Sequence, residues 1–209
     1  MLDSGRAKVE FYAPPPSARA RPVPRQTPNA VRIIGGRCRG RVVRFPPASA
    51  LRPTPDRVRE TLFNWLGQDL SGRATLEPYA GSGVLSLEAL SRGAAHAVAV
   101  DRDPKAVAAI AAHASDFGLD GLDVRRAEAR AFLGQDAGRY DVVFLDPPFA
   151  EDPWTWLLPL AAARLAEGGA VYAEAARPLA APPGLVVARN ARAGRVYYHL
   201  LRPEPGASR

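Results

Sequence analysis

A short stretch around Asp146 carries the side chains best suited to chemistry. The apolar run 142–145 is typical of a strand that is buried on both faces of a parallel sheet. Asp146 follows at the carboxyl end, the edge at which open α/β sheets bind ligands. Pro147 and Pro148 have no backbone N–H and end the strand, which leaves carbonyl and carboxylate acceptors beside the ring of Phe149. Such acceptors suit an exocyclic amino group on a planar base, whereas the alternative is an ordinary proline turn.

A glycine turn earlier in the chain predicts a site for a nucleotide-like cofactor. The segment 74–79 reads as the first strand of the main sheet, and 84–91 reads as a helix. The turn between them, 80–83, offers close backbone approach and free N–H groups at a helix start. Ser86 stands where the dinucleotide fingerprint has its third glycine, so the match to that fingerprint is incomplete.

A carboxylate follows about 20 residues after this turn. The apolar segment 97–100 reads as a second strand and ends at Asp101, a position where an acid commonly binds ribose hydroxyls. Asp103 and Pro104 fit the N-cap and the first position of a helix that runs to about residue 115. Asp101 is therefore the predicted ribose ligand and Asp103 the structural cap, with the reverse assignment as the alternative.

The basic charge is concentrated at the front of the chain. Residues 31–59 carry eight arginines and one acid, and residues 1–30 carry five basic and two acidic side chains. The whole chain has a net charge of +7, so the remainder is mildly acidic. This distribution suggests a polyanionic partner, and a solvated basic face is the alternative.

Two elements carry these arginines. The segments 31–36 and 41–45 predict a hairpin with Arg37, Arg39 and Arg41 at its tip. The next stretch, 51–66, predicts a helix with Thr54 as N-cap and Pro55 at the first helical position.

The start of this helix also predicts an anion site. Arg52, Arg57 and Arg59 lie at or near it, so a phosphate could be held there. The alternative is an ordinary amphipathic helix with salt-bridged arginines.

The remaining pattern alternates strands and helices and predicts a doubly wound sheet. A weak strand at 123–126 and the strand before Asp146 precede a helix at 154–166. A strand at 170–175 and an antiparallel pair, 185–189 with 195–201, close the chain. We divide the chain into a Pro/Arg-rich flexible extension (1–30), a basic hairpin and helix (31–70) and a catalytic domain (71–209).

Composition excludes several classes of protein. One cysteine, Cys38, permits no intrachain disulfide. The three histidines, His96, His113 and His199, are well separated and do not have metal-ligand spacing. No apolar run reaches membrane-spanning length and the N-terminus has no signal-peptide core, so a soluble cytoplasmic protein is expected.

The order of these motifs resembles that of a class I S-adenosylmethionine-dependent methyltransferase. The resemblance is carried by Glu77-x-x-Ala80-Gly81-Ser82-Gly83, by Asp101 and by the DPPF stretch 146–149. Methyltransferases with this type of motif act on exocyclic or amide nitrogens.

A closer resemblance is to the bacterial RsmD family, which methylates the 2-amino group of a guanine in 16S ribosomal RNA. It rests on IIGGRCRGR (33–41), LRPTPDRVRETLFNWL (51–66) and AGSGVLSLEALSRGA (80–94). The second of these is the most specific, because the general methyltransferase core does not require it. The resemblance covers roughly 31–202 and leaves 1–30 outside.

The resemblance implies a Rossmann-like fold with a seven-stranded sheet whose last hairpin is antiparallel, preceded by the basic hairpin and helix. It implies S-adenosylmethionine as cofactor, S-adenosylhomocysteine as product, and no metal. The implied cofactor-binding residues are Glu77, Tyr79, Ala80, Gly81, Ser82, Gly83, Asp101, Arg102, Glu128, Ala129 and Asp146. Glu128 replaces the usual Asp or Asn beside the adenine, and Tyr79 stands where the family often has Phe.

For the chemistry, the resemblance implies that Asp146 and the Pro147 carbonyl accept the two amino hydrogens and that Phe149 stacks on the base. The implied RNA-contacting residues are Arg37, Arg39, Arg41, Arg52, Arg57, Pro148 and Phe149. The expected partner is 16S ribosomal RNA or an assembling small subunit, bound by a monomer.

Three other functions compete with this one. A nicotinamide dehydrogenase would share the fold but would not explain DPPF. A methyltransferase that acts on another RNA, on DNA adenine or on protein glutamine would share the chemistry, although the 31–66 segment argues against DNA and protein. A non-catalytic RNA-binding protein would explain the arginines but not Asp101 and Asp146.

Overall fold

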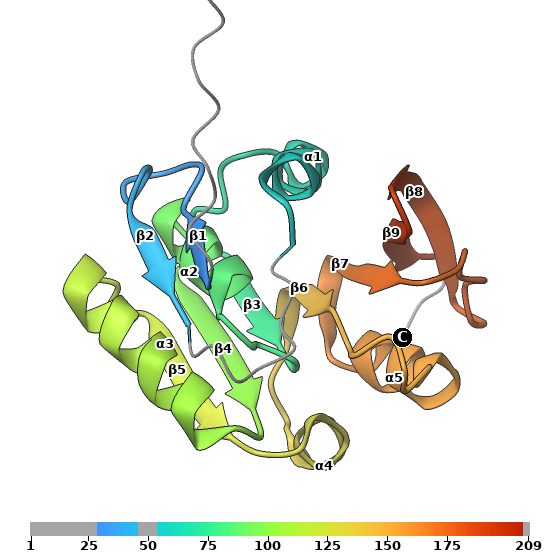
Figure 1. Cartoon of the computed structure of the whole chain (residues 1–209). Coiled ribbons are helices and arrows are strands. Elements are labelled where there is room, and N and C mark those ends of the chain that lie inside the picture. Colours follow the sequence, from blue (N-terminus) through green and yellow to red (C-terminus); the bar gives the residue numbers. More distant parts are fainter. Residues whose placement is uncertain (1–28, 46–53, 207–209) are drawn as a thin grey trace, which may run out of the picture.

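The computed structural model describes residues 29–45 and 54–206 (Figure 1). Most of the predicted extension 1–30 and the predicted RNA contact Arg52 lie outside the described residues.

A seven-stranded sheet forms the centre of the molecule, in the order β5-β4-β3-β6-β7-β9-β8. Strands β3 to β7 are parallel, whereas β9 runs antiparallel to both β7 and β8, so the predicted fold class is confirmed. The order reverses between β3 and β6, and such a switch point is where open α/β sheets bind ligands. The strands are β3 (Ala74–Glu77), β4 (His96–Asp101), β5 (Leu122–Arg126), β6 (Tyr140–Leu145), β7 (Leu165–Ala175), β8 (Leu185–Ala193) and β9 (Val196–Pro203).

Helices cover both faces of this sheet because its strands alternate their side chains between two apolar cores. In β4, Ala97 belongs to the core under α1 and α2, while Val98 belongs to the core under α4 and α5. Figure 1 shows α3 lying along the β4–β5 side of the sheet. The helices are α1 (Asp56–Leu66), α2 (Val84–Ser91), α3 (Pro104–Phe117), α4 (Ala129–Gln135) and α5 (Trp154–Ala162).

The predicted N-terminal hairpin consists of β1 (Ala30–Arg32) and β2 (Val42–Arg44), which pair antiparallel. Its apolar residues, among them Ile33 and Val43, join the same core as α1 and α2. Gly36 adopts a φ of +71°, and an added Cβ would lie 1.9 Å from the Ser91 carbonyl oxygen. Only glycine therefore allows the hairpin loop to approach the end of α2 this closely.

Two predicted boundaries were wrong. The helix expected at 154–166 ends at Ala162, and the strand expected at 170–175 begins at Leu165. Leu165 pairs with Tyr140 on β6, and an irregularity separates this pair from the regular ladder that starts at Ala170. The sequence around Gly168 reads as a turn after a helix, but it lies within a longer strand, at the irregularity of its pairing with β6.

In the described part of the chain, no helix is long and apolar enough to cross a membrane. Among those same residues, no group of three or more His, Cys, Asp or Glu side chains could hold a metal ion.

Candidate active site

Asp146 leaves the sheet at the carboxyl end of β6, beside the point where the strand order reverses. Its side chain is half-buried, and Pro147 behind it is buried. Pro148 is exposed, and Phe149 is 47% exposed, which makes it one of two exposed large hydrophobic side chains among the described residues. The DPPF stretch thus presents an acid and an open aromatic face at the ligand-binding edge of the sheet.

Two further acids stand on the strands that flank Asp146. Glu77 ends β3, and Glu174 lies near the end of β7. Leu145 pairs with Ala173, so Asp146 and Glu174 occupy neighbouring positions across the β6–β7 ladder. Burial raises the pKa of Asp146 well above its usual value, and the charges of Glu174 and Glu77 raise it further, while a hydrogen bond with Thr54 lowers it.

Glu174 was not predicted, although it is one of the most buried acids of the protein, at 3% exposure. Its Oε1 accepts hydrogen bonds from the Thr54 hydroxyl, at 2.9 Å, and from the Tyr172 hydroxyl, at 2.8 Å. Burial raises the pKa of Glu174, and these two donors lower it. The available signal was an acid inside the apolar run 170–175, where burial of a carboxyl requires partners.

The predicted helix cap at Thr54 was wrong. The N-cap position of α1 is Pro55, which has no capping side chain, and Thr54 precedes it. The Thr54 hydroxyl instead donates to Glu174 across 120 positions of sequence. Local spacing suggested a cap because Thr before Pro is a common helix start, but the buried carboxyl of β7 takes the hydroxyl.

The predicted cofactor turn is held at the end of β4 by hydrogen bonds from its own backbone N–H groups. Ala80 N–H donates to the Val100 carbonyl at 2.9 Å, and Gly81 N–H donates to Asp101 Oδ2 at 2.7 Å. Gly83 adopts a φ of +69° at the start of α2, and an added Cβ would meet Ile110 at 2.7 Å. Glycine at this position is therefore needed both for the conformation and for the contact with α3.

Glu77 is 4% exposed and binds the first turns of α2. Its Oε2 accepts from the Ser86 N–H at 2.9 Å and from the Ser86 hydroxyl at 2.6 Å. Burial nevertheless dominates and raises the pKa of Glu77 from 4.5 to about 7. Ser86, which breaks the dinucleotide fingerprint, is thus the partner of the acid that ends β3.

The two acids after β4 differ in what they bind. Asp103 is the N-cap of α3 and accepts from the Lys105 N–H at 2.8 Å, as predicted. Asp101 is half-buried; its Oδ1 accepts from the Asp103 N–H and its Oδ2 from the Gly81 N–H. Asp101 therefore links the glycine turn to the end of β4, while its ribose role stays a prediction.

The other predicted cofactor residues surround this turn less tightly. Exposed Arg102 lies 4.0 Å from Glu151 Oε1, in the loop that follows Phe149. Glu128 is exposed at the N-cap position of α4, and its side chain makes no capping hydrogen bond within the described residues. Tyr79 is half-buried, and burial raises its pKa to about 12. Ser82 is half-buried and Ala129 is buried.

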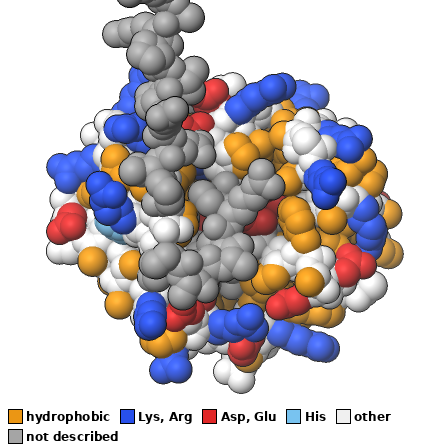
Figure 2. All heavy atoms as spheres, in the orientation of Figure 1, with side chains coloured by type: hydrophobic (Ala, Val, Ile, Leu, Met, Phe, Trp, Pro, Cys, Tyr) orange, Lys and Arg blue, Asp and Glu red, His pale blue; other side chains and the backbone are white. Residues whose placement is uncertain are grey.

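Two of the three arginines at the hairpin tip contact the end of α3. Arg37 Nη2 donates to the Gly118 carbonyl at 2.8 Å, and Arg41 Nη1 donates to the Asp116 carbonyl at 2.7 Å. Arg39 is exposed, as is Arg57 on α1. Figure 2 shows basic side chains on the left, the side on which Figure 1 draws β1 and β2, and others at the upper right.

Arg59 cannot hold a phosphate as predicted, because it is completely buried. Its guanidinium donates to Glu88 at 3.1 Å, to Asp56 at 2.6 Å, to the Arg32 carbonyl at 2.7 Å and to the Thr54 carbonyl at 3.3 Å. The salt-bridged alternative is therefore correct for this arginine. Arg59 ties the hairpin, the start of α1 and α2 together.

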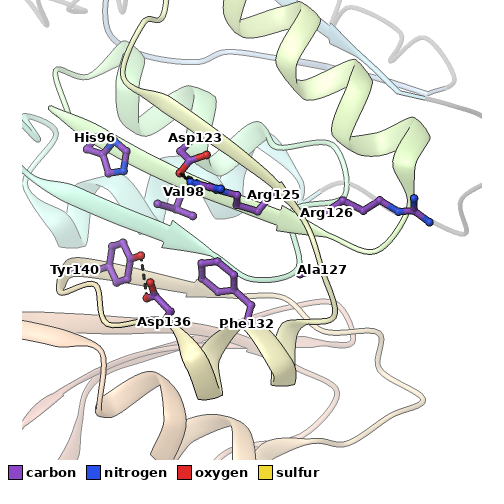
Figure 3. A pocket seen from close by; sticks show the side chains of 9 residues that line it. All are labelled: His96, Val98, Asp123, Arg125, Arg126, Ala127, Phe132, Asp136 and Tyr140. Carbon is purple, nitrogen blue, oxygen red and sulfur yellow. Dashed lines mark hydrogen bonds and ion pairs between the residues drawn. The ribbon is translucent and has the colours of Figure 1, made fainter.

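A cavity of about 500 Å³ lies elsewhere, between α4 and the open face of β4 and β5 (Figure 3). Its described lining residues are His96, Val98, Asp123, Arg125, Arg126, Ala127, Phe132, Asp136 and Tyr140, and none of them is a predicted site residue. Within it, the Tyr140 hydroxyl donates to Asp136, and Arg125 pairs with Asp123. We assign the candidate active site to the strand ends around Asp146 rather than to this cavity.

Comparison with protein families and curated proteins gives a consistent result. Residues 31–202 match the family described as conserved hypothetical protein 95. Over 119 residues the chain is 43% identical to ribosomal RNA small subunit methyltransferase D of Escherichia coli K12; this covers 57% of the chain and only 60% of that relative. The protein of the same description in Haemophilus influenzae is 35% identical over 194 residues, which cover 85% of the chain and 97% of the relative.

Solved structures agree on the fold. A candidate methyltransferase of Escherichia coli superposes with a TM-score of 0.76 at 36% identity, over 84% of this chain and 98% of that one. A more distant methyltransferase-like protein, SMU.776, whose structure contains S-adenosylhomocysteine, has a TM-score of 0.66 at 13% identity, over 85% of this chain and 57% of that one, and shows the shared fold alone.

Proposed function

The chain belongs to the RsmD family, and on that basis we propose that it transfers a methyl group from S-adenosylmethionine to the 2-amino group of a guanine in 16S ribosomal RNA. The observation that carries the proposal is Asp146 at the switch point of the sheet, next to the exposed ring of Phe149. A dehydrogenase or a passive RNA-binding protein would have no use for this pair.

The residues around the glycine turn fit the cofactor. Gly81 and Gly83 adopt positive φ angles of 51° and 69°, which bring the backbone close to a ligand. Each Asp101 oxygen accepts one backbone N–H and keeps a lone pair for a ribose hydroxyl. Glu77 stands where a carboxyl would face the positively charged methionine end. Tyr79, Arg102, Glu128 and Ala129 would border the adenosine.

S-adenosylmethionine supplies a methyl group that is already activated, so the chain's own task is to orient the amino group and to accept its hydrogens. Asp146 and the Pro147 carbonyl would accept the two amino hydrogens and direct the nitrogen lone pair toward the methyl group. Acceptors fixed in this way stabilise the positive charge that develops on nitrogen. Asp146 would then take the departing proton, and the ring of Phe149 would stack on the base.

We propose that RNA approaches over residues 31–70, with residues 71–209 as the methyltransferase domain. Arg39 and Arg57 are exposed, and the hairpin has its other tip arginines oriented by the end of α3. Contacts of this kind bind phosphates and are independent of base sequence. The substrate is 16S ribosomal RNA or an assembling small subunit, and the protein acts as a cytoplasmic monomer.

The test is single-turnover methyl transfer with saturating RNA. Asp146→Ala should lower the rate about 10²–10³-fold, the usual loss for one preorganised transition-state partner, while cofactor and RNA affinities change little. Asp146→Asn keeps an acceptor oxygen and should retain more activity than Asp146→Ala. Asp152→Asn is the matched control, because this exposed acid of the same loop pairs with Arg177 at the surface.

The same assay, run in parallel on undermethylated small-subunit RNA, DNA and protein, identifies the substrate class. Phe149→Tyr should be tolerated and Phe149→Ala should not, because only the former keeps the aromatic face. Wild-type rates for Asp146→Ala would reduce the DPPF stretch to a proline turn and refute the proposal.

A further inference from the structure

The last hairpin of the sheet carries positive charge that no acid balances. Residues 175–203 contain five arginines and no acid. Two of these arginines have partners in other elements: Arg177 pairs with Asp152 at 3.0 Å, and Arg202 Nη1 donates to the Gly168 carbonyl at 3.1 Å. The other three are exposed, lie on β8 or in the turn before β9, and form no ion pair within the described residues: Arg189, Arg192 and Arg195. Their charge is therefore available to a ligand.

The strand register places this hairpin at the same edge of the sheet as the proposed catalytic acid. Asp146 and Glu174 are neighbours across β6 and β7, Glu174 pairs with Tyr198 on β9, and Tyr198 pairs with Ala191 on β8. The turn at 194–195 lies just beyond this row, on the carboxyl side of β6 and β7. β8 is three strands away from β6, a separation of about 14 Å, since neighbouring strands lie about 4.8 Å apart.

The hairpin is also packed against the segment over which we propose that RNA approaches. Trp65 of α1 lies on Tyr198 with ring centroids 5.4 Å apart, and Ala191 and Ala193 of β8 pack against the same core. Figure 1 draws β6 between the N-terminal hairpin and the β8–β9 hairpin, and Figure 2 shows basic side chains at its upper right, the side of β8 and β9. Basic elements therefore stand on both sides of the strand that ends at Asp146.

Arg192 and Tyr197 add a flat surface to this charge. The Arg192 guanidinium lies over the Tyr197 ring, 4.9 Å from its centroid, and its Nε donates to the Gly194 carbonyl at 2.8 Å. The guanidinium is thus oriented on one face by the ring, while its exposed face can stack on a base. A charged surface that includes stacked planar groups suits unpaired RNA better than a membrane or an acidic peptide.

We propose that Arg189, Arg192, Arg195 and Tyr197 form a second RNA-binding surface, which holds the strand on the side of the target guanine opposite the N-terminal hairpin. The inference rests on the proposed function, because the target base is assigned by that function. A base must leave its stack to reach Asp146, and contacts with the nucleotides on both sides of it offset the cost of this movement.

The test is RNA binding without cofactor, measured by fluorescence anisotropy on labelled, undermethylated small-subunit RNA at several salt concentrations. The double substitution Arg189→Gln and Arg195→Gln removes two charges whose side chains have no partner within the described residues. The slope of the logarithm of the binding constant against the logarithm of the salt concentration should fall by about 1.4–1.8. At 0.1 M salt, the same loss of two phosphate contacts lowers the affinity about 25- to 60-fold.

A matched control keeps the change in net charge and alters its place. Arg125→Gln with Arg139→Gln removes two exposed arginines, one on the opposite edge strand β5 and one before β6, and should leave the slope unchanged. Tyr197→Leu should lower the affinity about tenfold without changing the slope, because it removes a stacking face and no charge. Tyr197→Phe keeps the ring and should bind like wild type. Thermal melting of each variant checks that the fold is retained.

Charge on an edge strand also prevents the strand from pairing with another molecule, and β8 is an edge strand. If this is the only role of Arg189 and Arg195, the double variant will self-associate in sedimentation and bind RNA with the wild-type slope. That result would overturn the inference.

Single-turnover methyl transfer separates the inference from the proposed function. The double variant Arg189→Gln and Arg195→Gln should react at nearly the wild-type rate with saturating RNA and more slowly with limiting RNA. If its salt slope matches that of the control variant while guanine is still methylated, the second surface is wrong and the proposed function stands. If the slope falls as expected but wild-type protein does not methylate guanine, the proposed function fails alone.

Discussion

Glu77 provides a quantitative test of the electrostatics at the carboxyl edge of the sheet. Its pKa is raised from 4.5 to about 7, chiefly by burial at the end of β3, against two hydrogen bonds from Ser86. A rise of about 2.5 pH units is worth about 3 kcal/mol, since each unit corresponds to about 1.4 kcal/mol. The side chain is fully enclosed, so solvent screening does not reduce this figure.

The sign follows from the direction of the shift. A carboxyl whose pKa is higher in the folded state stabilises the fold below pH 4.5, and this contribution is lost as the pH rises through about 7. Glu77→Gln imitates the protonated acid and keeps an acceptor for Ser86. The free energy of unfolding of Glu77→Gln, relative to wild type, should therefore increase by about 2–3 kcal/mol between pH 5 and pH 8.

Urea denaturation followed by tryptophan fluorescence at several pH values measures this difference. Comparing the variant with wild type at each pH cancels the contributions of titrating groups that do not interact with Glu77, whereas the repulsion between Glu77 and Asp146 is part of the measured difference. Parallel stability curves for the two proteins would show that Glu77 ionises normally in the folded state, and the account of this edge would be wrong.

Three further predictions follow from the described contacts. Glu88→Ala should lower the free energy of unfolding, measured by urea denaturation, by about 3–5 kcal/mol, because it leaves the buried guanidinium of Arg59 with only the partly exposed Asp56 as an acidic partner. Glu60→Ala, at an exposed site on α1, should cost less than about 0.5 kcal/mol, and a similarly small loss for Glu88→Ala would refute the anchoring role. Asp101→Ala should weaken cofactor binding measured by calorimetry. Asp103→Ala should leave that affinity unchanged and lower the free energy of unfolding by about 1 kcal/mol, because α3 loses its N-cap. The reverse result would exchange the roles of the two acids. For RNA binding, Arg39→Ala should lower by about one the slope of the logarithm of the binding constant against the logarithm of the salt concentration. Arg139→Ala should leave this slope unchanged, because Arg139 precedes β6, at the end of the strand away from Asp146. An unchanged slope for Arg39→Ala would place the RNA surface elsewhere.

Features that depend on a few consecutive residues could be predicted from the sequence. The cap at Asp103, the turn between β3 and α2 and the proline end of β6 each follow from local backbone chemistry. Alternating strands and helices then allowed one parallel sheet, and the position of Asp146 at its carboxyl edge followed from that topology.

Features that depend on distant partners could not be predicted. Arg59 and Glu88 are 29 positions apart, and Thr54 and Glu174 are 120 apart, so spacing alone gave each arginine and threonine its commonest local role. Considered alone, an arginine at a helix start suits phosphate binding and a threonine there suits helix capping. In the folded protein both side chains instead pair with a buried carboxyl on another element, because leaving that carboxyl unpaired would cost more free energy.

The acids at the sheet edge show why these long-range partners persist. Glu77, Asp146 and Glu174 come from three neighbouring strands, and burial raises the pKa of each of them. Apolar side chains at these positions would stabilise the fold more, since burial opposes every carboxylate. The same poorly solvated environment strengthens the attraction between a carboxylate and a positive charge that forms beside it. The proposed site, which would receive a cationic cofactor and a nitrogen becoming positive, would therefore gain in transition-state stabilisation what the folded protein loses in stability.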